Sequence, residues 1–252
     1  METKVGFVHW LRLLRVATGF LTVLPLARED DKPEEIAASS AFFPLVGLLI
    51  GGGVYGVFWV TRFVFETPFL PALLALAVWV VFTRGLHLDG LADVVDALGA
   101  PVFDREARES ILKDPSLGTF GAIALFLVLS FKFFLFLETQ NWEVILLAPL
   151  VARFFVLGII CFGRYLLRGS GLGSIFLIGP KGSTAFWVWL LVIATLLVLS
   201  GKAFLFLKIC LCFVIIYSFA RGVARILGFL NGDVMGAAIE LGELLFLLAG
   251  RI

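Results

Sequence analysis

Residues 144–162 read VILLAPLVARFFVLGIICF, an apolar run in which Arg153 is the one charged side chain. A helix rises about 1.5 Å per residue, so a run of this length crosses most of a hydrocarbon core about 30 Å thick. A charge in the middle of the run is costly against lipid, so we expect Arg153 to face a polar cavity inside the protein. The stretch therefore predicts a transmembrane helix packed among other helices.

Six further apolar runs of similar length follow one another along the chain. Together with residues 144–162 they predict an all-α fold, a polytopic integral membrane helical bundle of about seven transmembrane helices. No soluble domain, low-complexity tract or internal repeat stands out, so residues 1–252 are predicted to form a single membrane-embedded domain. The six runs are 42–61, 68–83, 119–137, 184–200, 204–220 and 234–249.

The composition agrees with a membrane protein. Of the 252 residues, 61% are apolar and 15% are charged, whereas about a quarter of the residues in a soluble domain are charged. The mean hydropathy is +1.06, which leaves too few polar residues to cover a soluble fold. The net charge of +1 provides no basic surface, so we expect a lipid bilayer and no nucleic acid as surroundings.

Residues 7–27 form a different kind of apolar segment. Their large apolar side chains gather near one helical face, and Arg12 and Arg15 lie beside that face. We expect an amphipathic helix that lies in the membrane interface or re-enters the bilayer, with a true span as the alternative. The two arginines interrupt the apolar stretch, which argues against a cleavable signal peptide.

The distribution of basic residues predicts how the chain is oriented. Most lysines and arginines outside the apolar runs fall in alternate loops, whereas the opposite loops hold Arg62, Lys202 and Arg251. Positive residues concentrate on the cytoplasmic side of a membrane. We expect a multi-pass protein of the cell inner membrane whose site faces the cytoplasm. The cytoplasmic loops would be 28–41, 84–118, 163–183 and 221–233.

One acidic segment, TRGLHLDGLADVVDAL at residues 83–98, places Asp89, Asp93 and Asp96 at positions i, i+4 and i+7. On a helix the three carboxylates share one face, and no interleaved cation offsets their repulsion. The intervening residues are mostly apolar, so the acidic face points toward something polar. We expect a divalent cation, Mg²⁺ or Mn²⁺, because hard ions prefer oxygen ligands. A solvated acidic face is the alternative.

A second acidic segment opens the last apolar run, where Asp233, Glu240 and Glu243 again share one helical stripe. Ionisable residues at membrane depth mark functional sites by default, although an interfacial helix with hydrated carboxylates would give the same pattern. Both acidic segments fall on the side that the basic residues assign to the cytoplasm. We therefore expect one shared site, with Asp233 as a further metal ligand.

Cationic side chains are available for a phosphate-bearing substrate. Arg164 and Arg168 flank the glycine-rich segment 169–173, whose backbone amides could approach a phosphate. Lys113 lies in a further polar patch. His87 could act as a general base, but helical geometry turns it away from the aspartates, so hydrogen bonding is an equal alternative. Carboxylates, a metal and cations together favour phosphoryl transfer.

Several of these segments resemble the signature of the cobalamin synthase family, the adenosylcobinamide-GDP ribazoletransferases. The most specific block is GLHLDGLAD at residues 85–93, followed by Asp96. The chain departs from the family at Asp96-Ala-Leu, where Asp-Gly-Leu is usual, and at Asp114-Pro-Ser, where Asp-Ser-Arg is usual. The second departure removes a positive charge. The remaining matches are FLTVLP at 20–25, FPLVG at 43–47, ILKDPSLGTFG at 111–121 and GDVMGA at 232–237.

The resemblance implies a transferase of a late step in vitamin B12 biosynthesis. Such enzymes join α-ribazole, or its 5′-phosphate, to adenosylcobinamide-GDP with Mg²⁺ and release GMP. The ribazole 5′ oxygen would attack the phosphorus attached to cobinamide, and the oligomeric state is left open. Metal and diphosphate would be held by Asp89, Asp93, Asp96 and Asp233, with His87 and Lys113 also catalytic; the substrate and its phosphates would be bound by Arg153, Arg164, Arg168, Asn231 and Glu240.

Two other functions remain open from the residues alone. A CDP-alcohol-type phospholipid synthase also displaces a nucleoside monophosphate at membrane carboxylates, but Asp93-Val-Val-Asp96 lacks the following Gly-x-x-Ala-Arg and Gly-x-x-x-Asp-x-x-x-Asp. A cation-coupled transporter would place polar or broken segments in several spans. The carboxylates of this chain collect instead at one face of the membrane.

Overall fold

The computed structural model describes residues 6–101, 104–139, 142–163, 166, 175–176 and 183–251. Their regular secondary structure is helical, which confirms the all-α prediction. In chain order the elements are α1 (Phe7–Leu21), α2 (Pro33–Ser39), the short 3-10 helix η1 (Ser40–Phe42), α3 (Phe43–Val64), α4 (Phe69–Phe82), α5 (Leu86–Gly99), α6 (Arg105–Leu112), α7 (Thr119–Glu138), α8 (Trp142–Phe162), α10 (Ser183–Leu199), α11 (Ala203–Leu227) and α12 (Gly232–Ala249).

Every one of the seven predicted apolar runs forms a helix, and the polytopic bundle is confirmed. Four helical stretches among the described residues are long and apolar enough to cross a bilayer: Pro33–Val64, α7, α8 and α11. A fifth span results if α4 and α5 form one broken helix, bent by 84°. α10 is apolar but has 17 residues, and three carboxylates interrupt the apolar sequence of α12.

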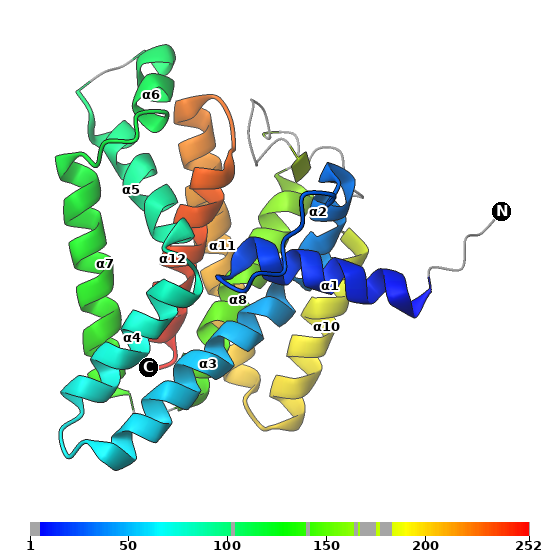
Figure 1. Cartoon of the computed structure of the whole chain (residues 1–252), viewed down its shortest axis with the longest axis vertical. Coiled ribbons are helices and arrows are strands. Elements are labelled where there is room, and N and C mark those ends of the chain that lie inside the picture. Colours follow the sequence, from blue (N-terminus) through cyan, green and yellow to red (C-terminus); the bar gives the residue numbers. More distant parts are fainter. Residues whose placement is uncertain are drawn as a thin grey trace.

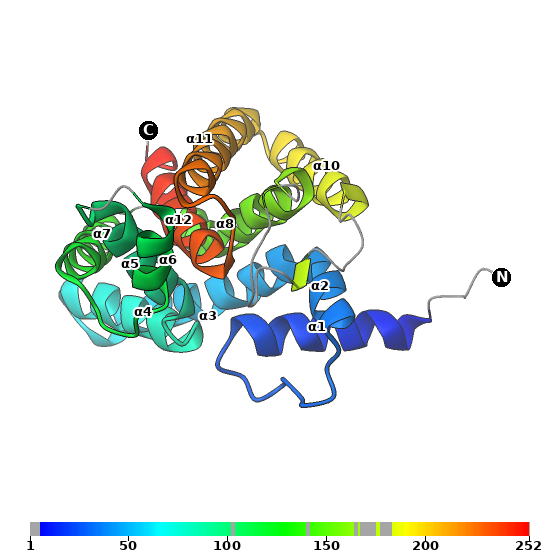
Figure 2. The ribbon, with the colours of Figure 1, turned by 90° about the horizontal axis from the view of Figure 1, so that it is seen from above.

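The bundle is built around α8, with α3 and α12 packed along it (Figures 1 and 2). Buried side chains line α8 from Val144 to Ile160, which explains why its sequence is apolar on all sides. The outer faces of α7, α10 and α11 expose apolar side chains such as Phe126, Leu191 and Leu207. These faces suit contact with lipid rather than with water.

The N-terminal segment forms an amphipathic helix, α1, that lies across the long helices (Figure 1). Phe7 and Trp10 are exposed on it, whereas Leu13 and Val16 are buried against the bundle. Arg12 pairs with Glu35 at 2.8 Å. The predicted helix is confirmed, and its place in the membrane interface stays a prediction.

The bend between α4 and α5 is made by two consecutive left-handed residues, Arg84 at φ 56° and Gly85 at φ 63°. Glycine adopts this conformation without a steric penalty, but arginine does not. The Nη2 atom of Arg84 donates to the carbonyl oxygens of Gly19 at 3.3 Å and Phe20 at 3.2 Å, which holds the bend against α1. The bend aims α5, with its aspartates, at α12.

Candidate active site

The two acidic segments meet where α5 crosses α12 (Figure 1). The backbones approach closely at Gly90, where an added β-carbon would lie 2.9 Å from the Cα of Asp233. On the other helix, a β-carbon on Gly236 would lie 3.3 Å from the Cα of His87. Segments that are distant in the sequence are therefore side by side, as the sequence predicts.

Asp89, Asp93 and Asp233 form an acidic triad at this crossing. Asp93 is within electrostatic reach of both other carboxylates. Asn231 caps α12, because its Oδ1 accepts from the amide of Val234 at 3.1 Å, and its Nδ2 donates to Asp233 at 2.6 Å. In the described part of the chain, no lysine or arginine forms an ion pair with the acidic triad.

Asp96 has a different environment from the other aspartates of α5. One of its carboxylate oxygens accepts from the amide of Gly118 and the other from the amide of Gly121, each at 2.9 Å. These amides belong to the beginning of α7, where helical N–H groups lack partners within the helix. Asp96 thus caps α7 from a neighbouring helix, and both of its oxygens already have donors.

Asp89 stands between two hollows in the protein surface. A small cavity of about 210 Å³ is bordered on its polar side by Asp89, Asn231 and Asp233. A large hollow of about 530 Å³ is bordered by Asp89, Asp93 and Arg84. Leu86 and Asp89 line both. A group bound in one hollow could therefore react with a group bound in the other beside the Asp89 carboxylate.

The acidic triad fits Mg²⁺ only as part of a site that substrate completes. Among the described residues, no three His, Cys, Asp or Glu side chains are close enough together to hold a metal ion. Mg²⁺ at phosphoryl-transfer sites commonly takes one or two carboxylates, with phosphate oxygens and water as the other ligands. Asp89 and Asp93, one helical turn apart and bordering one hollow, fit that donor set.

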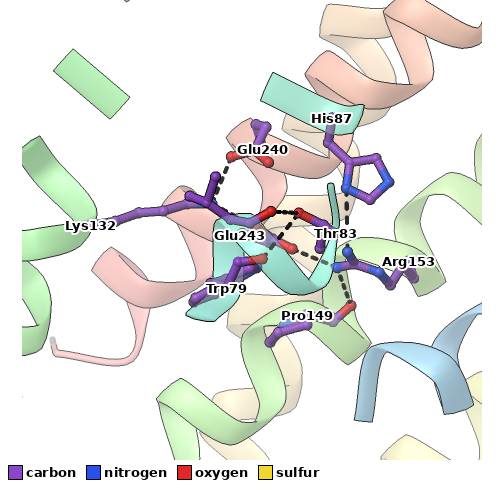
Figure 3. A network of polar contacts seen from close by, with 9 residues as sticks. Trp79, Thr83, His87, Lys132, Pro149, Arg153, Glu240 and Glu243 are labelled. Atoms are coloured by element: carbon purple, nitrogen blue, oxygen red, sulfur yellow. Dashed lines mark hydrogen bonds and ion pairs between the residues drawn. The ribbon is translucent and has the colours of Figure 1, made fainter. Parts of the chain in front are cut away.

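Below the crossing, a second set of charges is buried inside the bundle (Figure 3). The Nζ of Lys132 donates to Glu240 at 2.7 Å and to Glu243 at 2.6 Å. Arg153 donates to Glu243 at 2.5 Å and lies 3.4 Å from the Nδ1 of His87. All five side chains are at most 3% exposed. We call Lys132, Arg153, Glu240 and Glu243 the ion-pair network.

Comparison with known proteins places the chain in a family. The family model described as cobalamin-5-phosphate synthase matches residues 13–250. The chain belongs to the cobalamin-5-phosphate synthase family. No solved structure matches it.

Three curated relatives carry the name adenosylcobinamide-GDP ribazoletransferase. One from Pseudomonas fluorescens (strain Pf-5) is 38% identical over 92% of this chain and 96% of its own length. Those from Geotalea daltonii and Clostridioides difficile are 34% and 30% identical, over 94% and 91% of this chain and 96% and 93% of their own lengths. The resemblance stated from the sequence motifs is therefore confirmed.

The cobalamin-5-phosphate synthase signature at residues 85–93 thus lies on α5, against both hollows. Arg153 and Glu240, predicted to contact substrate, are instead paired within the ion-pair network. Lys113 is exposed at the end of α6 and pairs with Glu109 at 2.8 Å. Arg164 and Arg168 lie outside the described residues.

Two residues of this region were not singled out from the sequence. Lys132 lies within the apolar run 119–137, where a lone lysine is itself a signal of a buried partner. Arg84 falls in the predicted loop 84–118, and in the structure it borders the large hollow. Its neighbour Gly85 was the available signal, because glycine is one of the strongest indicators of a turn or loop.

Proposed function

We propose that this protein transfers adenosylcobinamide phosphate from adenosylcobinamide-GDP to α-ribazole, or to α-ribazole 5′-phosphate, and releases GMP. The observation that carries the proposal is the position of Asp89 on the boundary between two hollows, in a chain of the cobalamin-5-phosphate synthase family. The large hollow would take the diphosphate of the donor, and the small cavity would take the acceptor. The whole chain would act as one membrane-embedded unit.

In the proposed reaction a ribose hydroxyl of the acceptor attacks the phosphorus attached to cobinamide. A P–O bond to the ribose forms, the bond to the bridging oxygen breaks, and GMP leaves with that electron pair. The family description names a 5-phosphate product, so the 5′ oxygen of a phosphorylated acceptor is already esterified. We therefore replace the 5′ oxygen, expected from the resemblance, by a secondary ribose hydroxyl.

Each carboxylate would have a catalytic role that depends on the hollow that it borders. Asp233, which lines the small cavity with Asp89, would take the proton of the attacking hydroxyl as general base. The hydrogen bond from Asn231 at 2.6 Å would keep the Asp233 carboxylate oriented for that step. Asn231 would thus act by positioning Asp233 and not by binding phosphate itself.

Asp89 and Asp93 would hold Mg²⁺ in the large hollow. The ion would neutralise charge that develops on the phosphate oxygens. This revises the expected four-carboxylate set, because Asp96 caps α7 and Asp233 borders the acceptor side. Chelation with EDTA should abolish GMP release, and Mg²⁺ or Mn²⁺ should restore it where Zn²⁺ does so poorly. Full activity in excess EDTA would rule out the metal.

The hollows are proposed to open at the cytoplasmic face of the inner membrane. The support is the concentration of basic residues in alternate loops of the sequence. Cysteines introduced at Glu106, in α6, and at Glu66, between α3 and α4, mark opposite ends (Figure 1). In a background without native cysteines, an impermeant maleimide should label position 106 only in inverted vesicles and position 66 only in intact cells. The reverse pattern would overturn the orientation.

The decisive experiment follows nucleotide release. Purified protein in detergent is incubated with adenosylcobinamide-GDP, α-ribazole and Mg²⁺, and GMP and the cobamide product are separated by chromatography. Equal amounts of both products are expected. Release of CMP from CDP-diacylglycerol instead would indicate a phospholipid synthase, which the family comparison does not favour. Solute uptake into vesicles without a nucleotide product would indicate a transporter.

A further inference from the structure

One end of the small cavity is lined by aromatic side chains, which have no part in the roles proposed for the carboxylates. Phe20 and Phe43 stack nearly parallel at 6.0 Å between ring centroids, and Phe176 meets Phe43 edge to face at 6.0 Å. All three rings border the cavity. An apolar cavity of about 150 Å³ in another protein takes up benzene, so about 210 Å³ has room for a bicyclic aromatic ring.

His87, like Asp89, borders the same cavity from α5. It is 3% exposed, and its Nδ1 lies 3.4 Å from the Nη2 of Arg153. A guanidinium can only donate, so Nδ1 is the accepting nitrogen and the ring proton resides on Nε2. Nε2 is buried and has no hydrogen-bond partner among the described residues; the close-up of the polar network shows the whole ring (Figure 3).

We propose that the small cavity binds the aromatic base of the acceptor nucleoside and that the Nε2–H of His87 donates to its free ring nitrogen. The proposal rests on the proposed function. In α-ribazole one nitrogen of the benzimidazole carries the ribose, and the other has a free lone pair. A flat apolar ring with one hydrogen-bond acceptor matches a cavity that has aromatic walls and one hydrogen-bond donor without a partner. The ribose then lies toward Asp89 and Asp233.

The ion-pair network gives His87 its fixed tautomer. Arg153 is held by Glu243 at 2.5 Å, so its guanidinium stays against Nδ1 and the proton stays on Nε2. A buried donor without a partner destabilises the protein, and a hydrogen-bond acceptor on a ligand recovers that loss. Nucleosides whose base lacks the free nitrogen should therefore bind more weakly than α-ribazole, even though the shape of the base is the same.

The test compares α-ribazole with an analogue whose base is the corresponding indole, in which C–H replaces the free nitrogen. In the wild-type protein the KM for the indole nucleoside should be about tenfold higher or more, because the Nε2–H of His87 stays unpaired. The KM for adenosylcobinamide-GDP should be unchanged. His87→Phe, which keeps a ring but removes the donor, should use both acceptors equally. His87→Gln, which keeps an N–H donor, should restore part of the preference.

The outcomes separate this inference from the proposed function. If wild-type protein forms GMP and uses both nucleosides equally, the hydrogen bond from His87 is wrong and the transferase stands. The same conclusion follows if His87→Phe keeps the wild-type preference. The wild-type comparison decides the matter even if the variants fail to fold. If no GMP forms with either nucleoside, the proposed function itself fails.

Discussion

α12 carries two sets of carboxylates whose surroundings are opposite. Glu240 and Glu243 lie inside the bundle, and each meets a cation at 2.7 Å or less. Asp233, at the beginning of the same helix, joins the acidic triad, which has no ion-pair partner in the described part of the chain. The carboxylates that are paired with cations thus lie inside the bundle, whereas the carboxylates without a cationic partner lie beside the two hollows.

The difference teaches how to interpret charge in a membrane protein. The ion-pair network contains two cations and two anions, so it is complete without a ligand and connects α7, α8 and α12. The acidic triad contains three carboxylates, so its repulsion needs an external cation or protonation for relief. Burial alone marks both sets as functional candidates, whereas charge balance separates a structural connection from a site that binds something.

The largest expected effect is on stability, from breaking the ion-pair network. Lys132→Met keeps an apolar side chain of similar length but removes the positive charge that balances Glu240 and Glu243 inside the bundle. Removing one partner of a buried pair costs about 3–5 kcal/mol, so thermal unfolding in detergent should occur at a much lower temperature. The double variant Lys132→Met, Glu240→Gln should recover much of the loss. Unfolding of Lys132→Met at the wild-type temperature would contradict a structural role for the network.

The next effect is on activity, from neutralising two carboxylates of the acidic triad. Asp89→Asn with Asp93→Asn removes charge and keeps size, so kcat for GMP release should fall on the order of 10²-fold or more. The double variant should unfold at the wild-type temperature or slightly above it, because like-charge repulsion is lost. Asp104→Asn is the control, since asparagine caps α6 as well as aspartate does. An active double variant would exclude Asp89 and Asp93 from catalysis.

Much of the fold follows from the sequence because lipid imposes strong rules. Apolar runs of adequate length must become helices, and all seven do. The bend before α5 was not predicted, since it depends on Arg84 adopting a left-handed conformation that single-residue preferences disfavour. Hydropathy therefore located the helices, of which four or five are long and apolar enough to span a bilayer, but could not show that α4 and α5 meet at 84°.

The site was predicted less completely, for a physical reason. Helical spacing correctly put Asp89, Asp93 and Asp96 on α5, but it says nothing about which face meets which distant segment. The amides that Asp96 accepts from are 22 and 25 residues away. Arg153 was expected to face a polar cavity, and it meets Glu243 instead. Partners across helices decide such roles, and one sequence does not reveal them.

A smaller effect should follow from separating the two helices that form the site. In Gly90→Ala the new β-carbon would lie 2.9 Å from the Cα and the carbonyl oxygen of Asp233, so α5 and α12 must move apart. Overpacking of this kind costs about 1–3 kcal/mol, and GMP release should fall on the order of tenfold. Gly52→Ala, on α3, meets nothing within 4 Å and should leave activity unchanged. Wild-type activity in Gly90→Ala would show that the close approach is dispensable.

The smallest expected effect separates Asp96 from its neighbours on α5. Asp96→Asn keeps one acceptor oxygen for α7 and loses the other, so the cap at Gly118 and Gly121 is half retained. Loss of a cap costs about 1 kcal/mol, which lowers the unfolding temperature by roughly 2–4 °C in a protein of this size. Activity at a temperature well below unfolding should stay within about twofold of wild type, because no charge beside the hollows has changed. If Asp96 binds Mg²⁺ instead, kcat should fall on the order of 10²-fold, and raising the Mg²⁺ concentration should recover part of it. Measuring activity and unfolding in the same preparation therefore decides whether Asp96 belongs with the acidic triad or with the structural contacts of the bundle.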